Sequence, residues 1–208
     1  MTKRTPRAFS LVELIVVLGV VGLLLALSTP GLLQLPAVTL TSSGNEFANI
    51  VSLCRSEAIR QNTATRVGII VSSPVDEEEF RYFSGWRWDR TESSFRQFTS
   101  WKALAEGNQF QQELPKYLYD AEYAKKDPGL IRGVSLVSAD IEEKLIIDPV
   151  TKLEKKIRFV QFSPSGRASV PLDESRNIIA LIAKTNTVSN WVQINIDTLT
   201  GRSFIYRP

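Results

Sequence analysis

The chain of 208 residues contains no histidine and a single cysteine. Without histidine it lacks the commonest general base and the commonest side-chain metal ligand, so neither catalysis nor metal binding is expected. One cysteine also excludes a disulfide within the chain. We therefore predict no catalytic residue, no metal and no cofactor. We interpret Cys54 as a small buried apolar residue, with a reactive or intermolecular thiol as the alternative.

A large excess of charge is also missing, and the small excess present lies at one end. The formal net charge is +3, and three cations, Lys3, Arg4 and Arg7, precede residue 8. Because they equal the whole excess, the basicity indicates a targeting signal, and nucleic acid is not expected as a partner. The positive-inside rule predicts a cytoplasmic N-terminus and an exported remainder.

Behind these cations lies a long apolar run. The segment from Leu14 to Leu35 contains three polar side chains and no charge. As a helix it spans roughly 33 Å, which is enough to cross a bilayer, so we predict a transmembrane segment at about 11–35. Glu13 stands at the start of this run. A carboxylate at the centre of a membrane helix costs about 2.5–3.5 kcal/mol, so Glu13 needs a partner or a purpose.

The sequence around Glu13, Arg7-Ala8-Phe9-Ser10-Leu11-Val12-Glu13-Leu14, resembles the processing site of type IV prepilins and type II secretion pseudopilins. The resemblance implies that a prepilin peptidase/methyltransferase cleaves between Ala8 and Phe9 and methylates the new amino group of Phe9. Ala8 stands where the family usually has glycine, and alanine is small enough for us to expect processing.

The same resemblance implies how the chain assembles. Glu13 would pair with the free amino group of Phe9 in a neighbouring subunit, which neutralises two charges in an apolar bundle. Pro30 would bend or loosen the helix, because proline lacks an N–H group. The implied partners are other pilins or pseudopilins and the cytoplasmic (inner) membrane. The chain would be single-pass, with an extracytoplasmic head, and would enter a pilus or pseudopilus.

Two other interpretations of the N-terminal segment stay open. It resembles an ordinary secretory signal peptide with the basic region already described and a small-x-small cleavage site at Ala26-Leu27-Ser28. A plain uncleaved anchor is the other. Glu13 argues against the signal peptide, because a signal sequence gains nothing from a carboxylate at the start of its apolar core.

A second helical pattern follows at Ser43–Gln61, and with the first it forms one predicted helix over 9–62. Ser43-Gly44-Asn45-Glu46 has the form of a capping box at the start of this second pattern. Because β-branched and turn-forming residues cluster at Pro36–Ser42, we predict an interruption or kink there. The helix places Glu57 on the exposed side. Its apolar face is predicted to contain Phe47, Ile50, Val51, Cys54, Ala58 and Ile59.

After Asn62 the pattern changes to short strands separated by turns. We predict an α+β protein in which a leader (1–8) and a long N-terminal membrane-spanning helix precede a β-rich pilin-like head (63–208) with an insertion at about 102–129. The predicted strands are Arg66–Val71, Phe80–Trp86, Phe95–Trp101, Leu130–Val137, Lys144–Ile147, Ile157–Phe162, Ile178–Ala183, Trp191–Ile196 and Ser203–Tyr206.

Three short motifs refine the resemblance within the family. Arg55-Ser56-Glu57-Ala58-Ile59 and the two turns Ser163–Arg167 and Leu199–Arg202, each ending in Gly-Arg, resemble segments of H-type minor pseudopilins. The D component of Verru_Chthon-type cassettes is similar as well. The turns also have a purely mechanical interpretation, in which glycine supplies a positive φ and arginine is solvated.

The function expected from these features is that of a minor pilus or pseudopilus subunit, which is not an enzyme. The alternative is a minor pilin that binds DNA or a surface ligand through a basic patch. A secreted enzyme has no supporting residue spacing, and the acidic run Asp76–Glu79 matches no calcium loop and is interpreted as a solvated turn. The patch would contain Lys155, Lys156, Arg158, Arg167, Arg202 and Arg207.

Overall fold

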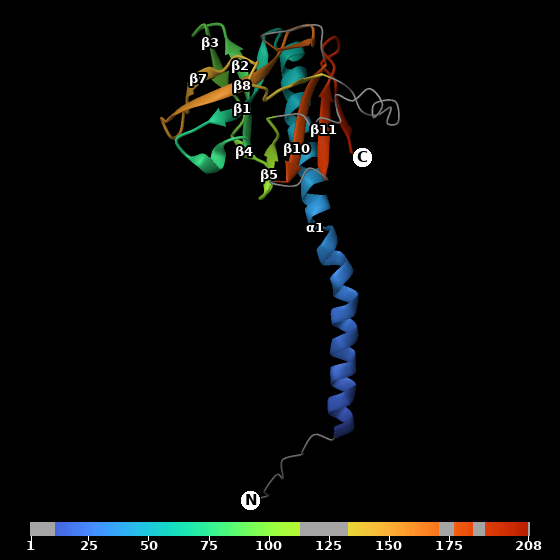
Figure 1. The fold of residues 1–208 in the computed structure, drawn as a ribbon. Coiled ribbons are helices and arrows are strands. Elements are labelled where there is room, and N and C mark those ends of the chain that lie inside the picture. Colours follow the sequence, from blue (N-terminus) through green and yellow to red (C-terminus); the bar gives the residue numbers. More distant parts are fainter. Residues whose placement is uncertain (1–10, 113–132, 171–176, 185–189, 208) are drawn as a thin grey trace, which may run out of the picture. The chain divides into compact units, whose positions relative to one another are not determined.

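The computed structural model describes residues 11–112, 133–170, 177–184 and 190–207, without the side chains of 22–38. The chain forms two compact units, Met1–Val38 and Thr39–Pro208. Helix α1, Leu11–Arg60, belongs to both (Figure 1). It is unbroken as secondary structure across Pro36–Ser42, so the predicted interruption there is wrong.

The contacts of Ser43 explain why the capping-box pattern at Ser43–Glu46 does not mark the start of a helix. Its side chain is 2% exposed and lies within α1, where its hydroxyl accepts hydrogen bonds from the Ala105 N–H at 3.0 Å and the Asn108 amide at 3.1 Å. Leu40, in the same stretch, is 1% exposed. The serine thus serves a contact with the head and caps no helix, because tertiary packing outweighs local capping preferences.

Two β-sheets make up the described head. The first has the strand order β3-β2-β1-β8-β7, with β4 paired to β2 and β9 to β8. Its pairs are antiparallel, and β1 lies at its centre (Figure 1). The strands are β1 (Thr65–Ser72), β2 (Tyr82–Asp89), β3 (Ser94–Gln97), β4 (Lys102–Ala103), β7 (Lys144–Ile147), β8 (Glu154–Phe162) and β9 (Ala168–Ser169), and a short 3-10 turn, η1 (Asp76–Glu78), separates β1 from β2.

The second sheet has the order β12-β11-β10-β5, with β6 paired to β10. Among the described strands, β6 and β10 form the one parallel pair. The strands are β5 (Asn108–Phe110), β6 (Val134–Ser135), β10 (Ile178–Lys184), β11 (Trp191–Ile196) and β12 (Ser203–Tyr206). Strands β4 and β5 fall at the start of the predicted insertion, and the residues from 113 to 129 of that segment lie outside the described part of the chain.

The core of the head joins α1 to both sheets. Phe47 of α1, Phe83 of β2 and Phe110 of β5 are at most 1% exposed, and their rings meet edge to face with centroids 5.0–6.0 Å apart. Such pairs add about 0.5–1.5 kcal/mol beyond the area they bury. Of the predicted apolar face of the helix, Ile59 is the exception, at 45% exposed.

Candidate functional site

The first described turns of α1 form an exposed apolar surface. Every residue from Leu11 to Val21 is exposed, and the large apolar side chains among them range from 45% exposed at Val21 to 77% at Leu11. They occupy all sides of the helix, and a helix that is apolar all round is typical of a membrane or the interior of a bundle. Within the described residues, no helix has both the length and the apolar character that a membrane crossing requires.

Glu13 lies in the first turn of α1. A carboxylate there is favourable for the helix itself, because the free N–H groups of the first turn carry partial positive charge, an effect of about 0.3–1 kcal/mol. The other residues predicted for processing and assembly are Ala8, Phe9 and Pro30. Ala8 and Phe9 lie outside the described residues, and Pro30 lies within α1 in the stretch whose side chains are not described.

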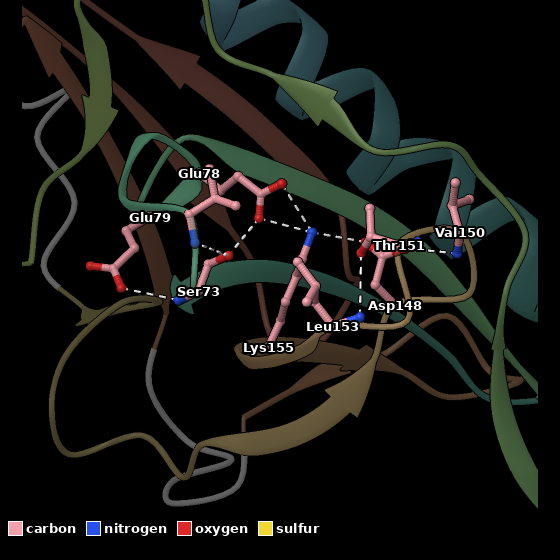
Figure 2. A network of polar contacts seen from close by, with 9 residues as sticks. Ser73, Glu78, Glu79, Asp148, Val150, Thr151, Leu153 and Lys155 are labelled. Atoms are coloured by element: carbon pink, nitrogen blue, oxygen red, sulfur yellow. Dashed lines mark hydrogen bonds and ion pairs between the residues drawn. The ribbon is translucent and has the colours of Figure 1, made fainter.

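The predicted basic patch does not form, because its cations lie in different surroundings. Lys155 is 2% exposed and its ammonium lies 2.8 Å from carboxylate oxygens of both Asp148 and Glu78. Figure 2 shows these groups pointing toward one another, with Ser73 donating its hydroxyl to Glu78. This buried ion cluster, Lys155 with Asp148 and Glu78, joins β8, the β7–β8 connection and η1.

Hydrogen bonds decide the charges in this cluster. Burial alone would raise the pKa of Asp148, but the Lys155 ammonium and the N–H groups of Thr151 and Val150 outweigh it and lower that pKa to about 2. Burial likewise opposes the charge of Lys155, and its bonds to the carboxylates of Asp148 and Glu78 raise its pKa. Asp148 and Lys155 therefore stay ionised at neutral pH, and Lys155 is not available to a ligand.

Three further cations of the predicted patch already have partners. Lys156 and Arg158 share the carboxylate of Glu143, at 3.3 and 2.8 Å, and Arg158 is 8% exposed. Arg207 donates to the Thr41 hydroxyl and to the Asn190 side chain. The structure does not support the interpretation of these residues as a DNA-binding surface.

Arg167 and Arg202 differ from these cations and belong to a feature that the sequence shows only as two separate turns. Gly166 has φ +82° and Gly201 has φ +65°, and a Cβ atom on Gly201 would lie 2.0 Å from the Gly166 carbonyl oxygen. The two Gly-Arg turns therefore abut, and only glycine fits where they meet.

The same pair of turns also contacts α1. The Nε–H of Arg55 in α1 donates to the Thr200 carbonyl at 2.7 Å. The two turn regions are also joined to each other, because the Ala168 N–H donates to the Thr198 carbonyl at 3.0 Å. We call Ser163–Arg167, Leu199–Arg202 and Arg55 together the Gly-Arg joint. Arg167 and Arg202 are exposed, and their side chains form no hydrogen bond or ion pair within the described part of the chain.

Glu57 departs from the sequence prediction. It was expected on the exposed side of the helix, but it is 8% exposed and accepts hydrogen bonds from Arg60 at 2.8 Å and Arg87 at 2.8 Å. Burial alone would raise its pKa, and the two guanidinium groups outweigh burial and lower it. Arg87 comes from β2, so helical periodicity alone had no means of revealing this partner.

The aromatic residues of β2 are divided between two faces. Phe83 belongs to the core, whereas Trp86 packs edge to face with Trp101, centroids 6.0 Å apart. On this outer face the guanidinium of Arg66 lies over the rings of Phe95 and Phe159, 3.6 and 4.0 Å from their centroids. These contacts are structural stacking of the kind expected for alternating strand positions.

Cys54 is fully buried, and its thiol is 3.5 Å from the Arg66 carbonyl. Burial raises its pKa to about 12. Because the thiolate is the reactive form of cysteine, this thiol is inert, as the structural interpretation of the sequence predicts.

Comparison with known proteins supplies one sequence match and several distant structural ones. Residues 3–29 match the prokaryotic N-terminal methylation motif. No curated protein matches the chain in sequence. Among solved structures, the minor pseudopilin EpsH of the Vibrio cholerae type 2 secretion system has 12% identity and a TM-score of 0.45, covering 81% of this chain and 97% of its own. The Pseudomonas aeruginosa type IV minor pilin FimU has 11% identity and a TM-score of 0.43, covering 80% and 92%.

These structural likenesses are too distant to transfer any function. The methylation motif is specific, and it covers Ala8, Phe9 and Glu13, the residues on which the sequence prediction depends. The chain has the predicted α+β architecture, a long helix that begins within the motif and a head of two mainly antiparallel sheets. The comparisons thus identify, at the start of this chain, the prokaryotic N-terminal methylation motif that the sequence pattern around Glu13 resembles.

Proposed function

We propose that this chain is a minor subunit of a type IV pilus or a type II secretion pseudopilus, and that it assembles through its N-terminal helix after its leader is removed. The observation that carries the proposal is the methylation motif at residues 3–29, with an apolar surface on all sides of α1 from Leu11 to Val21. Such a surface needs an apolar environment, and a membrane followed by a bundle of like helices supplies one.

The proposed sequence of events uses the residues of the N-terminal segment. The apolar helix inserts with Lys3, Arg4 and Arg7 on the cytoplasmic side and the head outside. A prepilin peptidase cleaves between Ala8 and Phe9 and methylates Phe9. In the filament, the carboxylate of Glu13 pairs with the amino group of a neighbouring Phe9, because an unpaired charge within an apolar bundle is costly.

The Gly-Arg joint supports the finer assignment to an H-type subunit. The two Gly-Arg turns and Arg55, which carry that resemblance in the sequence, come from three distant segments and meet at one place. Their shared location gives these three motifs a common structural purpose. The second sequence-based candidate, a DNA-binding module, is left without its patch, and we do not propose it.

Processing is tested by intact mass and N-terminal sequencing of the full chain, extracted from membranes after coexpression with its host's prepilin peptidase. We expect a chain that starts at methylated Phe9, and Ala8→Gly, the residue usual in the family, is the matched variant. A start near Thr29 would identify a signal peptide and overturn the filament function. An intact Met1 in both the wild type and Ala8→Gly would leave a plain anchor and reject processing.

A further inference from the structure

The two ends of the head carry opposite charges that no described group neutralises. At one end lies the Gly-Arg joint, with Arg167 and Arg202 exposed. At the other lies the acidic turn, which we define as Asp76 and Glu77, both exposed. Ion pairs and hydrogen bonds engage the other cations of the predicted basic patch, so this pair of arginines stands out from the rest of the set.

The positions of these two features along α1 show that they lie at opposite ends. The joint includes Arg55 of α1, and a Cβ atom on Gly166 would lie 2.9 Å from the Ile59 side chain. The chain continues from the acidic turn to Phe80, whose carbonyl accepts a hydrogen bond from the Phe110 N–H of β5. Strand β5 in turn contacts Ser43 through Asn108. From Ser43 to Arg55 the helix rises roughly 18 Å, which separates the two sites along the axis.

The joint also offers a place for a carboxylate. A hollow of about 290 Å³ opens beside Arg167 and is lined by Ser163, Ser165 and Ser169 as well. The Ser163 and Ser165 hydroxyls bond each other at 2.8 Å, so the group that suits a carboxylate is the Arg167 guanidinium, because arginine favours carboxylates through its planar fork of N–H groups. The carboxylates of Asp76 and Glu77 form no hydrogen bond or ion pair within the described residues, so they are available as the complementary group.

We propose that the Gly-Arg joint of one head binds the acidic turn of a second copy of this chain, end to end along the helix axis. The contact uses two different surfaces, so it is heterologous, and repetition of such a contact builds an open helical array. This inference rests on the proposed filament function and adds to it a specific head contact that is separate from the N-terminal helix bundle.

The test is a disulfide cross-link in the full chain in its own membranes. Ser165→Cys places a thiol at the rim of the hollow, and Val75→Cys places one beside the acidic turn without removing a charge. We expect the double variant to form a ladder of covalent oligomers on oxidation and each single variant to form at most a dimer. Cys54 is fully buried and will not compete.

Charge reversal then tests the chemistry of the contact in this cross-linking background. Arg167→Glu with Arg202→Glu should reduce the ladder by roughly fivefold to tenfold, since each exposed pair contributes modestly. Adding Asp76→Lys with Glu77→Lys to the same chain should restore it. Raising salt from about 50 mM to about 0.5 M should weaken the wild-type ladder as well, because exposed charges are screened.

The matched control is Lys144→Glu, which reverses an exposed cation of β7 that forms no ion pair or hydrogen bond in the described structure. It should leave the ladder unchanged. A ladder indifferent to the arginine reversals, or absent from the double cysteine variant, would overturn the proposal. The intact mass and N-terminal sequence of the chains in the same extracts separate the head contact from the processing step. Chains that start at methylated Phe9 but form no ladder would reject only the head contact. A charge-dependent ladder from unprocessed chains would reject only the processing step.

Discussion

At the scale of single residues, the head stabilises one buried cation with two carboxylates. Lys155 and Asp148 are 2% and 1% exposed, and neither side chain would be tolerable there without the other. Strand alternation in Glu154-Lys155-Lys156 predicts that neighbouring side chains point to opposite faces, but it does not indicate which face is buried. The burial of Lys155 depends on Glu78, which is distant in the sequence. The sequence alone therefore suggested that Lys155 binds a ligand at the surface, which the structure does not support.

Removing the cation of this cluster should destabilise the head strongly. Lys155→Met leaves the carboxylates of Asp148 and Glu78 without their ammonium, and breaking a buried pair in this way costs about 3–5 kcal/mol. The free energy of unfolding, measured in urea by tryptophan fluorescence of the detergent-solubilised full chain, checks this. The control is Lys156→Met, an adjacent lysine whose side chain is 53% exposed, which should cost less than about 1 kcal/mol. Equal losses from the two variants would show that the cluster contributes little.

The same cluster predicts a loss of stability in acid. The pKa of Asp148 lies at about 2 in the folded chain, below its ordinary value of 3.8, so the unfolded chain takes up this proton first. The contribution of Asp148 is therefore complete above pH 3.8 and is lost as the pH falls toward 2. The difference in unfolding free energy between the wild type and Asp148→Asn should shrink over this window. A difference that stays constant down to pH 2 would contradict the assignment.

At the scale of elements, strands were easier to predict than the ends and partners of the helix. The predicted strands Lys144–Ile147, Trp191–Ile196 and Ser203–Tyr206 agree with β7, β11 and β12 because period-2 patterns and flanking turns are local signals. The supposed cap at Ser43 failed because its hydroxyl serves a contact about sixty residues away in sequence. The two Gly-Arg turns were each predicted, but their contact with one another depends on sheet packing.

That contact makes a specific prediction about glycine. Gly201 and Gly107 both have positive φ, +65° and +78°, so alanine strains the backbone at either site. At Gly107 the nearest atom to a new Cβ is the flexible end of Lys184, 3.8 Å away, whereas at Gly201 it is the Gly166 carbonyl oxygen at 2.0 Å. Gly201→Ala should therefore lower the free energy of unfolding by roughly 1–3 kcal/mol more than Gly107→Ala in urea titrations. Similar losses would mean that the turns separate at little cost.

At the scale of the whole molecule, the chain combines a helix segment that exposes apolar side chains with a head that satisfies most of its own charges. The sequence predicts the first property, because a methylation motif and an apolar run are contiguous and need no tertiary information. It did not predict which cations of the head have hydrogen-bond or ion-pair partners. Arg158, for example, donates to the Val137 carbonyl and to the Glu143 carboxylate, which are distant from it in the sequence. Assembly contacts of the head are consequently visible only in three dimensions.

The Glu13 carboxylate provides the test of assembly by the whole chain. If it pairs with the amino group of a neighbouring Phe9 inside an apolar bundle, then Glu13→Gln leaves that amino group buried without its partner, which costs about 2–5 kcal/mol. We expect at least a tenfold loss of the chain from the sedimentable filament fraction, with membrane insertion and the processed mass unchanged, because glutamine keeps the shape of the side chain.

Glu46→Gln is the matched control for this measurement. Glu46 is a second carboxylate of α1, and its side chain is 42% exposed beside Lys102 at 3.8 Å. A solvated pair of this kind contributes little, so filament recovery should stay within about twofold of the wild type. If Glu13→Gln assembles as well as Glu46→Gln, the carboxylate has no part in registering the helices, and the exposed apolar surface from Leu11 to Val21 must direct their packing by itself.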